Sequence, residues 1–309
     1  MKLAIAIMLA AVLAVAAAAT EAPAKRSLSA PDCTRTSTGL VPLTDLGRRR
    51  YRGHRGGIYP NGRNRPSPAY LRLGNTWARR VRPIGGKIVL LSIGMSNTTA
   101  EFSAFKRRAD LDRRKSANVV IVDGAQSGAD AETIKVLEAP YWQFVEERLK
   151  AAGAAADQVQ AVWLKEAIAG EDRVFPRDAR ALQADLRAIG AILRRRFPNL
   201  RLIYLSSRTY AGYAITGLNP EPHAYQSAFA VRWLINERML GKVKGAWLGW
   251  GPYLWTDGVR GRRDGLVWAC EDVAQDGTHP SRTGAQKVAN LLLQFFRNDP
   301  TARVWYRRR

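Results

Sequence analysis

Residues 87–102 read Lys-Ile-Val-Leu-Leu-Ser-Ile-Gly-Met-Ser-Asn-Thr-Thr-Ala-Glu-Phe, a strand-like run followed by a helix-like one. The run Ile88–Ile93 is short, apolar and rich in β-branched residues, which is typical of a strand buried on both faces of a parallel sheet. Gly94 ends the run, and the pattern becomes helical from Thr98 onward. Ser96 is therefore predicted to lie between the carboxyl end of a strand and a helix, where open α/β sheets bind ligands.

The Ser96 hydroxyl admits two interpretations. A serine in such a turn can be exposed while nearby backbone N–H groups face a developing negative charge, as a nucleophile requires. Alternatively, Ser96 and Asn97 form an ordinary turn that caps the next helix. A nucleophilic serine also needs a base to accept its proton and a carboxylate to orient that base.

Such a base and carboxylate occur together near the carboxyl end of the chain. Of the three histidines, His54, His223 and His279, only His279 has a carboxylate three residues before it. The turn Asp276-Gly-Thr-His279 can present both side chains on one side and leads into a predicted helix. In the alternative interpretation, Asp276 and Thr278 simply cap that helix.

The rest of the chain alternates between predicted strands and helices. Apolar strands are expected at Asn118–Val122, Val159–Leu164 and Leu200–Leu205, and helices at Pro140–Gly153, Pro176–Phe197, Tyr225–Leu240 and after Pro280-Ser281. Two of the helices have apolar stripes at helical spacing, formed by Leu182, Leu186, Ile189 and Leu193 and by Val288, Leu291, Leu292 and Phe295. This alternation predicts a parallel, doubly wound sheet in a three-layer α/β/α fold.

From 87 to about 296, the chain resembles the SGNH/GDSL hydrolase superfamily. The motifs that carry the resemblance are Gly94-Met95-Ser96-Asn97, Gly124-Ala-Gln-Ser-Gly128 and Asp276-Gly-Thr-His279-Pro. The resemblance implies a flavodoxin-like hydrolase fold, with Ser96 as nucleophile, His279 as general base and Asp276 orienting it. It further suggests carbohydrate acetylesterase-like members as the nearest in character.

The resemblance also implies an oxyanion hole. The backbone N–H groups of Ser96 and Gly128 are the expected donors, with Gly124 as a second choice and Asn97 as a neighbouring candidate. The sequence departs from the family pattern in two places. Met95 replaces the usual Asp or Gln, and the third block, Val162–Ile168, has no Asn or Gln where the family supplies a side-chain amide.

Lys165 is the only residue of the third block that we expect to substitute for the missing amide. Its ammonium can donate to an oxyanion, whereas Ile168 cannot donate and Glu166 would repel the charge. Alternatively, Lys165 pairs with Glu166 or Glu171 at the surface.

Residues 245–268 are rich in glycine and tryptophan and do not follow the alternation of strands and helices. Trp250, Tyr253 and Trp255 lie shortly before the Asp276–His279 turn, and flat rings there are candidates for stacking on sugar rings. Packing in the protein core is the alternative interpretation.

The beginning of the chain is divided into two segments. Residues 1–20 read as a signal peptide, so the protein is expected to be secreted or periplasmic, with no membrane-spanning segment after cleavage. Residues 21–86 form a basic extension, predicted to be loop rather than helix from Gly47 to Arg82 because Gly, Pro and Asn are interleaved there. The hydrolase-like domain is placed at 87–309.

The extension holds much of the basic excess of a chain with 49 Lys and Arg against 26 Asp and Glu, a formal net charge of +23. Between Gly47 and Arg82, where no acidic residue occurs, its arginines are Arg48, Arg49, Arg50, Arg52, Arg55, Arg63, Arg65, Arg72, Arg79, Arg80 and Arg82. Such a surface binds polyanions. The export signal argues against nucleic acid, which leaves anionic polysaccharide, lipid headgroups or a merely solvated surface.

Cys33 and Cys270 are the only cysteines, and in an exported protein they are expected to form a disulfide, with two separate buried thiols as the alternative. No cysteine and histidine spacing resembles a zinc site, and no phosphate-binding glycine loop is present. We therefore expect neither a metal nor a cofactor.

These patterns predict a secreted serine esterase or acylhydrolase that removes a short acyl group, with an acylated carbohydrate as the expected substrate. The alternative is a catalytically weak module of the same fold that binds a glycan or an acidic polymer.

Overall fold

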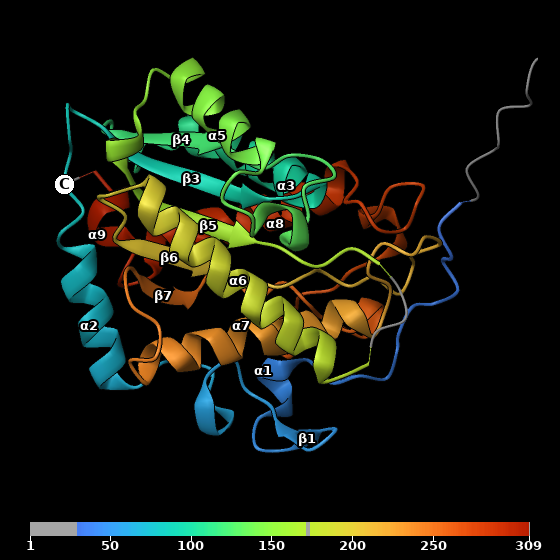
Figure 1. Cartoon of the computed structure of the whole chain (residues 1–309). Coiled ribbons are helices and arrows are strands. Elements are labelled where there is room, and N and C mark those ends of the chain that lie inside the picture. Colours follow the sequence, from blue (N-terminus) through green and yellow to red (C-terminus); the bar gives the residue numbers. More distant parts are fainter. Residues whose placement is uncertain (1–29, 171–173, 309) are drawn as a thin grey trace, which may run out of the picture.

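A computed structural model describes residues 30–170 and 174–308, so the predicted signal peptide lies outside the described residues. At its centre is a five-stranded parallel sheet with strand order β4-β3-β5-β6-β7 (Figure 1). The strands are β3 (Ile88–Gly94), β4 (Val119–Asp123), β5 (Val159–Lys165), β6 (Leu202–Leu205) and β7 (Trp247–Trp250). Every residue of β3 and β5 is buried, as the apolar runs predicted.

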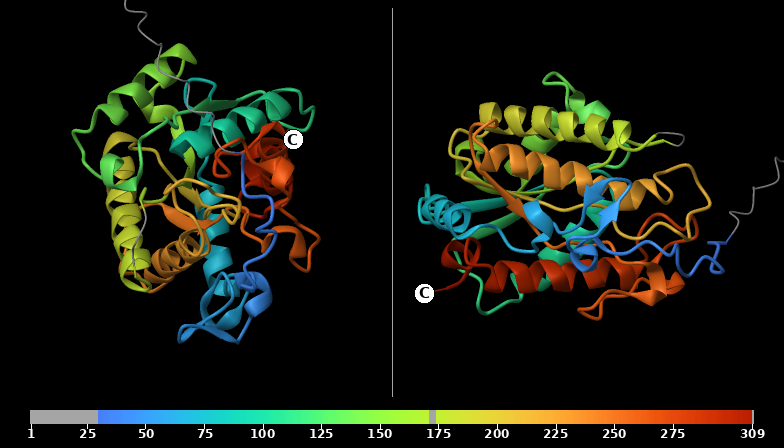
Figure 2. Two further views of the ribbon diagram at one scale, coloured as in Figure 1. Left: turned by 90° about the vertical axis from the view of Figure 1, so that its right-hand side faces the viewer. Right: turned by 90° about the horizontal axis from the view of Figure 1, so that it is seen from below.

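Helices cover both faces of this sheet (Figure 2). The long helices are α3 (Ser96–Asp110), α5 (Pro140–Ala151), α6 (Arg177–Arg196), α7 (His223–Met239) and α8 (Arg282–Asn298). Helix α3 packs against α8 on one face, and α6 packs against α7 on the other. The predicted three-layer α/β/α fold is confirmed, and the α6 stripe of Leu182, Leu186, Ile189 and Leu193 is buried.

Short helical segments complete the fold between the longer elements. They are α4 (Ala131–Ile134), α9 (Arg303–Tyr306) and the 3₁₀ turns η2 (Ala156–Gln158), η3 (Gly258–Arg260) and η4 (Cys270–Asp272). In the described part of the chain, we find no helix with the length and apolarity needed to cross a membrane.

Strand β7 is an element that the sequence patterns did not predict. Its four residues, Trp-Leu-Gly-Trp, pair in parallel with β6, with Leu202 opposite Trp247 and Leu205 opposite Trp250. The glycine and the surrounding aromatic residues obscured the strand pattern. The Gly/Trp-rich stretch thus begins as an edge strand of the sheet.

The amino-terminal extension contains α1 (Leu43–Leu46), β1 (Arg50–Tyr51), β2 (His54–Arg55), η1 (Pro60–Gly62) and α2 (Pro68–Ala78). The prediction that Gly47–Arg82 is loop is therefore wrong for the eleven residues of α2. Ser67 caps that helix by accepting a hydrogen bond from the backbone N–H of Tyr70, and Pro68 suits its first position. Tyr70 then donates its hydroxyl to the Leu248 carbonyl at 2.7 Å, which joins α2 to β7.

A disulfide between Cys33 and Cys270 fixes the start of the extension, as predicted, with the two Cα atoms 5.4 Å apart. Nearby, the fully buried carboxylate of Asp257 accepts hydrogen bonds from the Ser37 hydroxyl at 2.6 Å and the Thr38 backbone N–H at 2.7 Å. The extension is thereby held beside the segment that carries Asp276 and His279.

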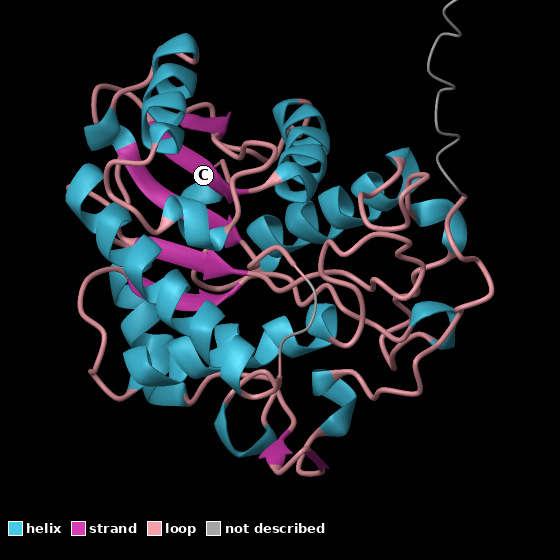
Figure 3. Ribbon diagram, turned by 45° about the vertical axis from the view of Figure 1, so that its right-hand side comes forward, coloured by secondary structure: helices cyan, strands magenta, loops and turns pink. Residues whose placement is uncertain are grey.

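The strand connections reverse direction at the centre of the sheet. The chain leaves β3 through α3 on one face, and it leaves the adjacent strand β5 through α6 on the other. The carboxyl ends of the strands point toward a region of loops (Figure 3). A crevice between β3 and β5 at this edge is the ordinary place for a ligand in a doubly wound sheet.

Candidate active site

The three predicted residues Ser96, His279 and Asp276 meet at this edge of the sheet. Ser96 is the first residue of α3, directly after β3 and Met95. Its Oγ lies 2.7 Å from Nε2 of His279, although the two residues are 183 positions apart in the chain. Nδ1 of the same ring is hydrogen-bonded to Oδ2 of Asp276. The arrangement is a hydroxyl, an imidazole and a carboxylate in series, as nucleophilic catalysis by serine requires.

The Asp276–His279 turn is held in shape by its own carboxylate. Oδ1 of Asp276 accepts hydrogen bonds from the backbone N–H groups of Thr278 at 3.0 Å and His279 at 2.9 Å. Gly277 has a φ of +68°, and a Cβ there would lie 1.9 Å from the Tyr213 carbonyl oxygen. Only glycine fits this position, because a side chain would meet both the strained φ and the neighbouring backbone.

The surroundings of Asp276 keep its carboxylate ionised. Burial raises its pKa, but the hydrogen bonds from the His279 ring and from the backbone N–H groups of His279 and Thr278 outweigh burial, so the pKa lies below its ordinary value. An ionised carboxylate can only accept, so Nδ1 of His279 carries the proton. In the neutral imidazole, Nε2 is then the acceptor that faces the Ser96 hydroxyl.

Asn97 contributes to the site by holding its two halves together. Its side chain is buried, and its amide nitrogen donates to the Thr278 carbonyl oxygen at 2.9 Å. The beginning of α3 is thereby tied to the turn that carries His279. This contact makes Asn97 a positioning residue, because its amide is already engaged by a backbone carbonyl.

The two glycines predicted as oxyanion donors differ in availability. The Gly124 N–H donates to Oγ of Ser92 at 3.2 Å inside the protein, so it is not available to a substrate. Gly128 is exposed, with a φ of +78° and open space around its Cα. At the start of α3, the backbone N–H groups of Ser96 and Asn97 have no acceptor within the helix. The helix start and Gly128 therefore remain as candidate donors.

Lys165 occupies a different environment from the one predicted. It is 2% exposed, and its ammonium nitrogen lies 2.7 Å from both carboxylate oxygens of Glu101, a residue of α3. Neither the oxyanion role nor a surface pair with Glu166 agrees with this contact, and Glu171 lies outside the described residues. Burial of the whole pair, together with bidentate hydrogen bonding, makes Lys165 a structural link between β5 and α3.

Trp250, Tyr253 and Trp255 are at most 5% exposed, so they have no free ring face for a sugar. The indole N–H of Trp250 donates to the Ile58 carbonyl at 2.6 Å, and that of Trp255 donates to Glu221 at 2.7 Å. Tyr253 accepts a hydrogen bond from the Leu43 N–H at 3.1 Å. The proposal that these rings stack on sugar is therefore wrong, and core packing against the extension is the correct interpretation.

Arg208 is the site residue that the sequence patterns missed. It follows β6 at the same edge of the sheet and is 3% exposed. Its guanidinium Nη1 contacts the Met95 sulfur, directly before Ser96, at 3.8 Å. The signal available in the sequence was the polar run Ser206-Ser207-Arg208-Thr209, which comes directly after an apolar strand.

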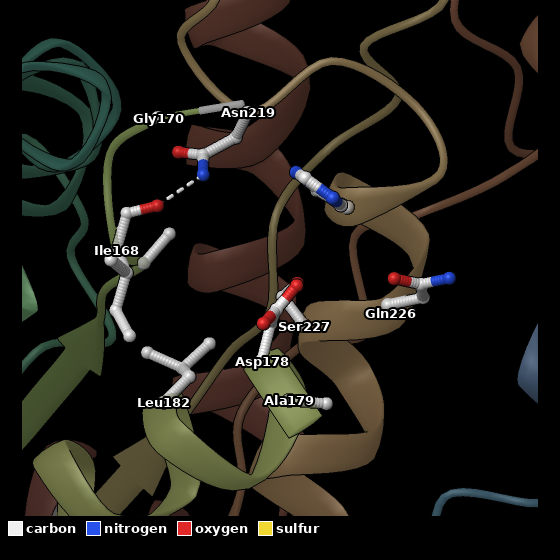
Figure 4. Close-up of a pocket in the computed structure, with 10 residues that line it drawn as sticks. Ile168, Gly170, Asp178, Ala179, Leu182, Asn219, Gln226 and Ser227 are labelled. Carbon is white, nitrogen blue, oxygen red and sulfur yellow. Dashed lines mark hydrogen bonds between the residues drawn. The ribbon is translucent and has the colours of Figure 1, made fainter. Parts of the chain in front are cut away.

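A small pocket lies at the carboxyl end of β5 (Figure 4). Residues from three segments line it: Ala167, Ile168 and Gly170 after β5, Asp178, Ala179 and Leu182 of α6, and Asn219, His223, Gln226 and Ser227 in and before α7. Asn219 donates to the Ile168 carbonyl across its rim (Figure 4). One of its lining residues, Ser227, accepts a hydrogen bond from the Arg208 backbone N–H at 3.2 Å.

No protein-family model matches the chain, and no curated protein matches its sequence significantly. Among solved structures, it is similar to a lipopolysaccharide acetyltransferase periplasmic domain from Salmonella ser. Paratyphi A, with 12% identity, a TM-score of 0.40, and coverage of 73% of this chain and 95% of that one. A protein from Arabidopsis thaliana shares 15% identity with a TM-score of 0.36, and the match spans 63% of this chain and slightly less than two thirds of that one, 66%. A salicylyl-acyltransferase from a tetracycline biosynthetic pathway gives 15% identity, a TM-score of 0.36, and coverage of 68% and 54%. TM-scores of this size carry no functional meaning, so the function is inferred from the site itself.

Proposed function

We propose that the protein is a serine esterase or acylhydrolase in which Ser96 is the nucleophile. The observation that carries this proposal is the unbroken series from Ser96 Oγ through the His279 ring to Asp276, with 2.7 Å between Oγ and Nε2. An ordinary helix cap would require neither the histidine nor the carboxylate behind it. The series also lies at the sheet edge where doubly wound folds bind ligands.

In the proposed reaction, Ser96 Oγ attacks the carbonyl carbon of an ester while Nε2 of His279 takes the hydroxyl proton. The tetrahedral intermediate carries its negative charge on the former carbonyl oxygen. When it collapses, the bond to the alcohol breaks and His279 returns the proton to the leaving oxygen. Water then attacks the acyl-serine by the same route, which releases the acid and restores Ser96.

The oxyanion of that intermediate needs hydrogen-bond donors that are already in place. The backbone N–H of Ser96 at the amino end of α3 and the backbone N–H of Gly128 are the proposed donors. The positive end of the α3 dipole adds to the stabilisation of negative charge at the same point. Neither donor requires a cofactor or a metal.

The proposed substrate is a short acyl ester of a carbohydrate, as the resemblance to carbohydrate acetylesterase-like hydrolases suggests. Export is supported by the apolar amino-terminal run and by the Cys33–Cys270 disulfide, since disulfides persist mainly in oxidising compartments. We therefore propose a secreted or periplasmic enzyme.

A serine-reactive fluorophosphonate probe tests this proposal. The wild-type protein is expected to become labelled, and labelling should disappear in Ser96→Ala. Ser116→Ala is the matched control. Ser116 precedes β4 and so lies at the amino ends of the strands, away from Ser96, and its removal should leave labelling intact. Labelling that persists in folded Ser96→Ala would contradict the proposed nucleophile.

A second candidate is a module that binds an acidic polymer with little catalysis. All eleven arginines between Arg48 and Arg82 are exposed, which favours a surface for polyanions. A folded wild-type protein that takes no fluorophosphonate and cleaves no short-chain ester would favour this candidate over the enzyme.

A further inference from the structure

Arg208 reaches across the carboxyl end of the sheet toward the nucleophile. Strand β5 lies between β3 and β6. Arg208 follows β6, yet its Nη1 contacts the sulfur of Met95, which follows β3. The side chain therefore spans the end of β5 and brings its guanidinium to the residue next to Ser96.

The guanidinium is buried without a matching carboxylate. Its Nε has no hydrogen-bond partner among the described residues, and the Met95 sulfur is only a weak acceptor for Nη1. No carboxylate in the described part of the chain lies within 4.0 Å of the group. A buried arginine in this condition retains unused N–H donors, which is costly unless an acceptor arrives during function.

Three of the four nearby acids are hydrogen-bonded to other groups. Four carboxylates, Glu101, Glu166, Glu221 and Asp276, oppose the burial that lowers the pKa of Arg208. Glu101 binds Lys165, and Asp276 holds His279. Glu221 accepts from the Trp255 indole and two backbone N–H groups.

Glu166 does not neutralise the arginine either. Burial raises the pKa of Glu166 well above its ordinary value, which favours the uncharged form of this acid. One of its oxygens accepts the Ala167 N–H at 3.0 Å, and the other has no partner among the described residues. The positive charge of Arg208 is thus left to act on whatever lies at the Ser96 turn.

The amino end of α3 favours the same kind of ligand. Its first backbone N–H groups lack helical acceptors, and its dipole is positive at this end. Ser96 is the first residue of the helix, so an ester carbonyl attacked by its Oγ develops negative charge close to that end. The guanidinium lies against the side chain of Met95, the residue that directly precedes this helix start.

We propose that Arg208 is a further catalytic residue, a cationic donor to the oxyanion formed when Ser96 attacks an ester. This inference rests on the proposed esterase function and adds to it the side-chain donor that Lys165 cannot supply. A guanidinium N–H binds the tetrahedral oxyanion more strongly than the neutral carbonyl, because the bond becomes charge-assisted on both sides. Its contribution should therefore appear mainly in kcat.

The test compares Arg208→Met with the wild type on 4-nitrophenyl acetate, which carries no charge. We expect kcat to fall by roughly 10²- to 10³-fold with KM changed by less than about threefold. Added methylguanidinium should restore part of the lost kcat. Arg232→Met is the matched control, because Arg232 is also buried but donates to the backbone carbonyls of Arg55, Gly56 and Gly57. That variant should keep the wild-type kcat even if its Tm falls.

An unchanged kcat in folded Arg208→Met would overturn the inference. It would also be overturned if only KM rose, and only for an ester bearing a carboxylate such as 4-nitrophenyl hemisuccinate, because Arg208 would then bind a substrate anion instead. If Arg208→Met does not fold, Arg208→Lys provides the test. A tenfold or larger loss of kcat at constant KM would support a role for the guanidinium group, and wild-type kinetics would refute it. Failure of the esterase proposal itself would appear in the wild-type protein, as absence of both labelling and turnover.

Discussion

Asp276 determines which nitrogen of His279 carries a proton. Its ionised carboxylate accepts from Nδ1, so Nε2 is free to take the proton of Ser96. In Asp276→Asn, the side-chain amide can donate to Nδ1, which favours the opposite tautomer with the proton on Nε2. We expect kcat on a short-chain ester to fall by about 10³- to 10⁴-fold at neutral pH, with little change in KM.

The control for this substitution is Asp264→Asn. Asp264 is also paired with a basic residue, Arg262 at 2.7 Å, but its side chain is 59% exposed and lies in a separate surface turn. This variant should retain wild-type kinetics, since exposed pairs contribute little. Equal activity of Asp276→Asn and Asp264→Asn in a steady-state ester assay would show that Asp276 only shapes the turn.

The residues that could be predicted from the sequence are those with a local signature. Asp276 and His279 are three positions apart, and Ser96 follows a recognisable strand and glycine. Lys165 and Arg208 lacked such a signature. Their partners, Glu101 and Met95, belong to other segments, and only the order of strands in the sheet brings them together.

At the scale of elements, the strands and helices with a continuous apolar pattern were predicted to within a few residues. Strand β7 has only four residues, and its two tryptophans flank a Leu-Gly pair, a pattern that loops share. Around helix α2, the prolines and glycines favour loop, and the capping serine Ser67 is a local signal for the helix start. Both elements are stabilised by packing against each other, which no local pattern reveals.

The contact between the extension and β7 gives a prediction about Trp250. This side chain is 5% exposed, donates to the Ile58 carbonyl at 2.6 Å, and packs edge-on against Tyr253 with ring centroids 5.8 Å apart. Trp250→Ala should therefore lower the free energy of unfolding by about 3–5 kcal/mol. The measurement is urea unfolding followed by tryptophan fluorescence or circular dichroism.

Kinetics on an acetylated sugar separate this structural role from sugar binding. If Trp250 is a core residue, folded Trp250→Ala should keep the wild-type KM at low temperature. Trp77→Ala serves as a comparison, since Trp77 on α2 is only partly buried and should cost less stability. A raised KM with undiminished stability would contradict the core assignment.

At the scale of the whole molecule, the formal net charge of +23 is unevenly distributed. The arginines between Arg48 and Arg82 are all exposed, and no acidic residue interrupts the segment Gly47–Arg82. The part of this segment around β1 lies on a different side of the molecule from α3 (Figure 1). The extension is anchored to the rest of the fold by the disulfide, by Asp257 and by β7, so a polyanion would bind an ordered surface.

We expect this surface to retain the protein on an immobilised anionic polysaccharide such as polygalacturonate, and salt to release it. Contacts between exposed charges are screened over about 10 Å at 0.1 M salt, so elution should follow ionic strength. Replacing Arg48, Arg49, Arg52 and Arg63 by glutamine should lower the salt concentration at elution. The matched control replaces four exposed arginines around the end of α3, namely Arg107, Arg108, Arg113 and Arg114, and so removes the same charge elsewhere. An equal shift of the elution salt concentration in the two variants would show that net charge alone governs retention. Salt-insensitive retention on neutral dextran would contradict an electrostatic surface altogether.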